Sequence, residues 1–153
     1  MRRLLAASQV LTIGLCLPGC GGGGGTTTPT STVPTPRPPV RSVILDGSFS
    51  LSSFTFARRP FAVASPGALD VTVDWTFASS HVWVYVAQGE CSVEQFQMRF
   101  QQTTCNFVLR SETDVPKPRM LELAGAPSGS YVLFVSNRSE VAESGVFRVG
   151  LTT

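Results

Sequence analysis

The residues that could support catalysis are few, and their spacing does not assemble a site. His81 is the only histidine, so a Ser–His–Asp triad or a histidine-based metal site would have to use it. No nucleophile-elbow motif surrounds it, and no second metal ligand lies at close spacing. We interpret His81 as a polar residue on a strand face, and we expect no enzyme activity, no cofactor and no metal site.

Two carboxylates, Asp70 and Asp74, share one face of an expected strand. At about 3.3 Å per residue, four positions along a strand separate them by about 13 Å. Paired glycosidase carboxylates lie about 5–9.5 Å apart, so this pair is too widely spaced for that chemistry. We interpret both as solvent-facing groups that pair with arginines on neighbouring strands.

The N-terminus carries a clearer chemical signal. Met1-Arg2-Arg3 is a short basic start, and residues 4–17 form an apolar run that Pro18-Gly19 interrupts. A helix that spans a bilayer needs about 20 mostly apolar residues, so this run is too short. The pattern is typical of a secretory signal peptide covering residues 1–19.

The end of that run, Leu17-Pro18-Gly19-Cys20, resembles the lipobox of bacterial lipoproteins. The resemblance implies that the Cys20 thiol takes a diacylglyceryl group, that signal peptidase II cuts before it, and that the new amino group is acylated, for example by palmitate. Two or more acyl chains hold a protein stably on a membrane. Gly21, in place of Asp, implies sorting to the outer membrane. The alternative is an ordinary signal peptide in which Cys20 is incidental.

Residues 20–41 form an expected tether. Seventeen of the twenty-one residues from 21 to 41 are Gly, Pro, Ser or Thr, and none is aromatic. Such a segment buries too little apolar surface to offset the entropy lost on ordering it. We expect a disordered spacer that lifts a domain of residues 42–153 off the bilayer, or solvated disorder with no specific role.

The cysteines predict one disulfide. Cys16 leaves with the signal peptide and Cys20 is consumed by lipid, so Cys91 and Cys105 remain in an exported domain, where disulfides persist. The alternative is a pair of metal ligands, but no further Cys or His lies near them.

Residues 42–153 indicate an all-β domain, an antiparallel sandwich of about eight strands. In residues 68–77, Val71, Val73, Trp75 and Phe77 alternate with polar residues, which is typical of a half-buried strand. Further strands are expected at residues 43–45, 48–56, 61–64, 81–86, 107–110, 119–123, 129–135 and 144–151. Helix is expected only around residues 92–96, where Ser92 and Gln95 fit a capping box.

The order Pro66-Gly67-x-Leu69-x-Val71-x-Val73-x-Trp75, followed by Gly129-x-Tyr131-x-Leu133-x-Val135-x-Asn137, resembles the bacterial pre-peptidase C-terminal domain. The resemblance implies a jelly-roll-like sandwich over about residues 45–153, and a corner role for Tyr131 with its hydroxyl bonded to nearby backbone. Some relatives bind Ca²⁺ near the strand after the Trp. Here that region, Ser80-His81-Val82-Trp83, lacks the acidic pair, so we expect no equivalent site.

His81, Trp83 and Tyr85 fall on one side of the strand at residues 81–86 and form a candidate binding face for a protein or glycan partner. If the sheet is covered on both sides, they are core instead, which the apolar pattern on both sides favours. The charged fraction of 14% and net charge of +2 exclude a nucleic-acid footprint. The sequence therefore predicts a lipid-anchored binding or accessory module of the bacterial cell envelope. The alternatives are a structural envelope lipoprotein without a small ligand and a hydrolase accessory domain.

Overall fold

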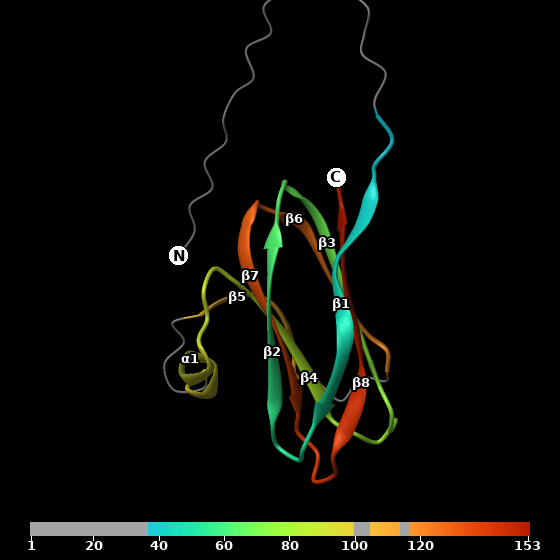
Figure 1. Cartoon of the computed structure of the whole chain (residues 1–153), viewed down its shortest axis with the longest axis vertical. Coiled ribbons are helices and arrows are strands. Elements are labelled where there is room, and N and C mark those ends of the chain that lie inside the picture. Colours follow the sequence, from blue (N-terminus) through green and yellow to red (C-terminus); the bar gives the residue numbers. More distant parts are fainter. Residues whose placement is uncertain (1–36, 100–104, 114–116) are drawn as a thin grey trace, which may run out of the picture. The chain divides into compact units, whose positions relative to one another are not determined.

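The computed structural model describes residues 37–99, 105–113 and 117–153; the expected signal peptide and Cys20 lie outside these ranges. The described residues form eight strands and one short helix (Figure 1). In chain order these are β1 (Arg41–Leu51), β2 (Phe56–Val63), β3 (Gly67–Trp75), β4 (Val82–Gln88), α1 (Val93–Gln97), β5 (Asn106–Ser111), β6 (Arg119–Ala126), β7 (Gly129–Asn137) and β8 (Glu143–Thr152).

The strands pair into two antiparallel sheets. One has the order β1-β8-β3-β6, and the other has the order β2-β7-β4-β5. Each strand lies in the other sheet from the strand before it, except that β4 and β5 share a sheet, and this is the arrangement of a jelly roll. The expected fold class, an all-β jelly-roll-like sandwich of about eight strands, is confirmed. Within the described ranges, no helix is long and apolar enough to cross a membrane.

Strand β3 shows how the interior core forms. Leu69, Val71, Val73 and Trp75 are all at most 3% exposed, while the residues between them are half-buried or exposed. Alternate residues of β4, β7 and β8 meet them from the other strands to fill the space between the sheets. The expected alternation is confirmed up to Trp75.

The strand does not continue to Phe77, which was expected on the buried side. β3 ends at Trp75, and the Phe77 side chain is 52% exposed. The N–H groups of Thr76 and Phe77 are bound by the carboxylate of Glu143. The Thr76 N–H also donates to the Ser144 carbonyl of β8, whereas the Phe77 N–H is bound by the Glu143 side chain, and the chain turns away from the sheet there.

A second expectation to be corrected is the continuous strand over residues 48–56. The alternation of Phe54 with Phe56 imitates a strand, but residues 52–55 form the turn between β1 and β2, closed by the Thr55 N–H donating to Ser52 O at 3.3 Å. β2 in turn extends back to Phe56, and it includes Pro60. Because β2 is an edge strand, the missing N–H of Pro60 leaves no ladder bond unmade.

A second apolar cluster lies on the outer side of the β2-β7-β4-β5 sheet. Helix α1, with Phe96, and the residues Cys91 and Cys105 cover this side (Figure 1). The ring of Phe96, from α1, stacks on Phe134 of β7 with centroids 4.0 Å apart. The cluster is completed by the buried residues Tyr85, Ala87, Cys91, Cys105 and Val132. Helix α1 has the expected capping box, with both reciprocal hydrogen bonds between Ser92 and Gln95.

At the end of the sandwich where β1 begins and β8 ends, Val40 pairs with Thr153, and their backbone groups exchange two hydrogen bonds. Pairing in β1 begins at Arg41, opposite Thr152. Backbone pairing with the end of β8 therefore includes Val40 and Arg41.

Candidate functional site

The structure separates the three residues of the expected binding face. Tyr85 is 1% exposed and packs edge-on against Phe96 of α1 with centroids 5.1 Å apart. Trp83 is half-buried at the margin of the same cluster, and His81 is exposed. Tyr85 is therefore core, as the apolar pattern on both sides of the strand indicates, and it cannot contribute to an open face.

Tyr85 is also held by an arginine. The Nε of Arg99 donates to the Tyr85 hydroxyl at 3.3 Å, and its guanidinium lies 4.2 Å from the centre of the Phe96 ring. Burial raises the pKa of Tyr85 to about 12, although the hydrogen bond from Arg99 acts in the opposite direction. The phenol is thus a neutral acceptor near pH 7, with a packing role.

The predicted disulfide is present. Cys91 and Cys105 are bonded, their Cα atoms are 5.4 Å apart, and both are nearly fully buried against the outer cluster. Arg58 of β2 donates to the carbonyl of Cys91 at 2.9 Å and pairs with Glu90 at 3.3 Å. Arg58, which the sequence placed in no strand, thus ties the base of the disulfide segment to the sheet.

The expected corner tyrosine is confirmed. Tyr131 is fully buried, and its hydroxyl donates to the carbonyl of Pro127 at 2.8 Å. Asp70 pairs with an arginine, as expected, but Arg41 lies on β1, and β8 separates β1 from the strand of Asp70, so the two strands are not neighbours; the pair is 2.7 Å apart. Asp74 instead faces Lys117 at 3.5 Å.

The most extensive network of polar contacts lies at the end of the sandwich opposite the start of β1 and the end of β8. The strand register brings three connections to this end: residues 52–55, 76–81 and 138–142. Leu51 pairs with Glu143, Trp75 with Gly145, and Val82 with Asn137. These three connections gather at one end in Figure 1.

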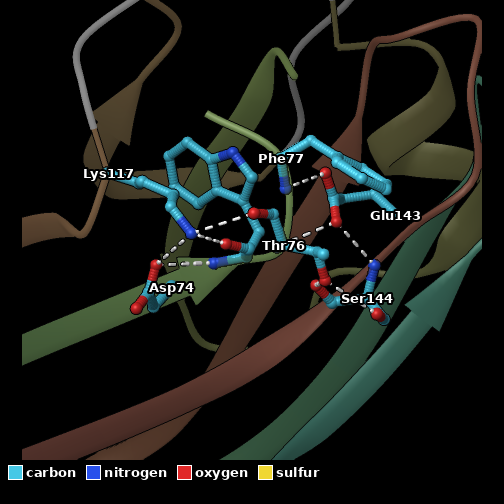
Figure 2. A network of polar contacts seen from close by, with 7 residues as sticks. Asp74, Thr76, Phe77, Lys117, Glu143 and Ser144 are labelled. Atoms are coloured by element: carbon cyan, nitrogen blue, oxygen red, sulfur yellow. Dashed lines mark hydrogen bonds and ion pairs between the residues drawn. The ribbon is translucent and has the colours of Figure 1, made fainter. Parts of the chain in front are cut away.

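Glu143 binds two of these connections to each other. Its carboxylate is 2% exposed and accepts backbone N–H groups from Thr76 at 2.9 Å, Phe77 at 3.1 Å and Ser144 at 2.9 Å (Figure 2). Burial by itself raises the pKa of Glu143, but the hydrogen bonds that its carboxylate accepts outweigh it, so the pKa lies below its usual 4.5. The carboxylate is therefore a charged structural acceptor.

Asn137 links the connection of residues 52–55 to that of residues 138–142. It is fully buried, and its amide donates to the carbonyls of Ser52 at 3.1 Å and Val141 at 2.7 Å. Its side-chain oxygen accepts the N–H of Ser139, whose hydroxyl accepts the N–H of His81 at 2.7 Å. Asn137 and Glu143 together fix all three connections in position.

Lys117 closes the same end from the segment before β6. Its ammonium donates to the carbonyls of Trp75 and Thr76, and it lies beside the Asp74 carboxylate (Figure 2). Within the described ranges, no group of three His, Cys, Asp or Glu side chains is placed to hold a metal ion. The chemistry available at this end is binding and positioning.

Three apolar side chains stand out from these connections. Phe54, Phe77 and Val141 are 58%, 52% and 54% exposed, one on each connection. We call this set the loop-end surface. Sequence reasoning missed it, because Phe54 and Phe77 extend the alternation of the neighbouring strands and so resemble buried positions.

A groove of about 710 Å³ lies on the outer face of the β1-β8-β3-β6 sheet. Charged side chains of both signs line it, among them Asp46 and Arg148. The exposed Val146 of β8 also lines it. Neither this groove nor the smaller one beside Trp75 is lined by the loop-end surface.

No family model matches the chain, and no curated protein matches it. Among solved structures, the chain is similar to the pre-peptidase C-terminal domain of a collagenase from Bacillus anthracis, with 13% identity, a TM-score of 0.48, and coverage of 72% of this chain and 90% of that one. It is also similar to PliG of Aeromonas hydrophila, a periplasmic inhibitor of g-type lysozyme, with 15% identity, a TM-score of 0.43, and coverage of 75% and 86%. The assignment of the jelly roll rests on this chain's own strand order.

Proposed function

We propose that the protein is a lipid-anchored binding or accessory module of the bacterial cell envelope, held through Cys20 and exposing its sandwich on a tether, with the outer membrane as its site. It carries out no catalysis of its own. The lipobox-like segment and the signal-peptide pattern supply the anchoring half of this proposal.

The observation that carries the proposal is the disulfide between Cys91 and Cys105. Stable disulfides belong to oxidising compartments outside the cytoplasm, which agrees with an exported chain. With Cys16 removed together with the signal peptide, the disulfide leaves Cys20 as the one thiol available for acylation.

The binding half is supported by the loop-end surface. Buried polar residues fix three connections whose apolar side chains remain exposed. A structural lipoprotein without a ligand is the competing function, and it has no need of such a surface.

The test is acylation at Cys20. The protein purified from membranes should show a mature chain that starts at Cys20 and carries added acyl mass, and it should enter the detergent phase on phase separation. Cys20→Ser should move it to the aqueous phase, whereas the matched Cys16→Ser variant should behave as the native protein does. An unmodified Cys20, or a chain cut at another position, contradicts the proposal.

A further inference from the structure

The loop-end surface is more than three scattered exposed residues. Lone exposed apolar side chains are ordinary on protein surfaces. Here Phe54, Phe77 and Val141 come from three different connections that the strand register brings to one end of the sandwich. Their common location calls for a partner that they contact together.

Phe54 adds an independent sign of function. Its φ is 57°, in the left-handed region, where a bulky side chain is a genuine outlier and Gly or Asn is usual. Its side chain is also 58% exposed, so the domain gains little packing from it. An unfavourable backbone conformation that presents an aromatic ring to the outside indicates a contact made beyond the domain.

The connections are held so that these side chains stay exposed. Asn137 bonds to the carbonyls of Ser52 and Val141, and Glu143 bonds to the N–H of Phe77. Each apolar residue is therefore fixed directly, or through a residue two positions away, by a fully or almost fully buried polar group. The surface is preorganised and cannot fold back onto the sandwich without breaking these bonds.

The chemistry around the surface points to an uncharged, apolar occupant. The guanidinium of Arg138 lies 4.9 Å from the ring centre of Trp83, and the ammonium of Lys117 is bound by backbone carbonyls. The exposed charged or titratable residues on the three connections are His81 and Glu140. Because the residues stand on turns and do not line the two grooves nearby, a small molecule that needs a concave site is a poor fit.

The length of chain before the sandwich decides which apolar surface lies within reach. Cys20 and Arg41 are twenty-one positions apart in the sequence, and at about 3.3–3.6 Å per residue this length of chain spans up to about 70 Å. The eleven residues of β1 measure about 35 Å. The chain can therefore run back along the domain and bring the far end to the membrane that holds Cys20.

We propose that the loop-end surface docks on that bilayer, with Phe54, Phe77 and Val141 inserting into the interfacial region of the phospholipids. This inference rests on the proposed lipid anchor and deepens it. Three side chains alone bind weakly, as a single acyl chain does, but the tether keeps the bilayer at a high effective concentration. A fluid bilayer also accepts three separate side chains without a matching set of pockets.

The experiment places a reporter on the surface. The mature chain from Cys20 onward is coupled through its Cys20 thiol to maleimide phosphatidylethanolamine in phosphatidylcholine vesicles that carry nitroxide lipids labelled near the headgroup. Phe77→Trp reports on the surface. Met120→Trp is the matched control, since Met120 is 66% exposed on the outer face of β6. After subtraction of Trp75 and Trp83 emission, we expect quenching of the Phe77→Trp probe to be about threefold greater than that of the control.

Phe54→Asn in the Phe77→Trp chain completes the test. Asn accepts the left-handed conformation, so its melting temperature should be equal or higher while quenching falls to the control level. Quenching should be equal at low and high salt, because the contact is apolar.

Equal quenching of the two probes, or quenching retained in Phe54→Asn, overturns the proposal. Loss at high salt overturns apolar insertion. Burial of the probe without vesicles, rising with protein concentration, assigns the surface to a second copy, and burial only on adding envelope proteins assigns it to a protein partner. Maleimide coupling replaces the natural lipid, so this result is independent of whether Cys20 is acylated in cells.

Discussion

The outer faces of the two sheets differ. The outer face of β1-β8-β3-β6 is open and carries charged residues such as Asp46 and Arg148. The outer face of β2-β7-β4-β5 is covered by α1 and the disulfide segment, and it buries a second apolar cluster. One domain thus holds a core between its sheets and a smaller core outside one of them.

The difference is visible in the strands themselves. β3 alternates buried residues with half-buried or exposed ones, whereas β7 is buried at every position from Tyr131 to Asn137. A strand that is apolar on both sides needs a cover on both, and α1 with its cross-link supplies the second cover. Tyr85, one of the three residues of the expected binding face, therefore packs against the domain's own helix.

The sharpest test of the comparison uses neighbouring residues of β7. Leu133 belongs to the interior core and Phe134 to the outer cluster, and both are fully buried. Phe134→Ala should lower the free energy of unfolding by about 3–5 kcal/mol, and Leu133→Ala by about 2–5 kcal/mol. Denaturant unfolding of both variants measures this. If Phe134→Ala alone lowers the free energy of unfolding by less than about 1 kcal/mol, the outer cluster contributes little to the stability of the domain.

Removing the disulfide should destabilise the outer cluster more than the interior core. The disulfide closes a segment with a sequence separation of 14. The chain-entropy model gives about 3 kcal/mol for a loop of about 15 residues, so the double variant Cys91→Ser, Cys105→Ser should melt several degrees lower.

Hydrogen exchange then locates the effect. Protection should fall around α1 and the outer cluster, while the amides of β3 and β8 keep their order of protection. The reduced native protein is the matched control. Uniform loss of protection across both sheets would contradict the separation of the two cores.

The smallest of these effects concerns the loop end. Because the folded pKa of Glu143 lies below its ordinary 4.5, its carboxylate contributes stability that is complete above that value and is lost as pH falls through the folded pKa. Glu143→Gln should remove this part of the acid dependence. It should also cost about 1–3 kcal/mol at pH 7, since an amide cannot accept from all the donors.

The control for Glu143→Gln is Glu140→Gln, an exposed carboxyl on the same connection. The Glu140→Gln variant should have nearly the native stability at pH 7. Its stability should also change with pH between pH 5 and pH 2 as that of the native protein does. If the two variants give the same pH profile in thermal melts, Glu143 does not act as the charged acceptor that its contacts indicate.

The interior core was predictable because its signal is local. The alternation in β3 and the capping box of α1 follow from neighbouring residues, and the pairing of Cys91 with Cys105 followed once the other cysteines were accounted for. The corner bond of Tyr131 followed from a resemblance and not from periodicity.

The rest depended on contacts between distant residues. Phe54 and Phe77 extend the strand alternation in the sequence, and only the hydrogen bonds of Asn137 and Glu143, from another part of the chain, turn them out of the sheets. Arg58 lies in β2 because its backbone pairs with Phe134 of β7, and its side chain binds Glu90 and the Cys91 carbonyl. Local pattern carries none of this information.

The register of β1 against β8 has a mechanical consequence. β1 is paired with β8 from Arg41 to Leu51, and the chain enters at Arg41. A force that pulls on the chain before Arg41, while the opposite end of the domain is held, acts parallel to the strands. The load is then shared by the whole β1–β8 ladder in shear, where a pull across the strands would open the bonds one pair at a time. The β1–β8 pairing thus resists tension applied along β1.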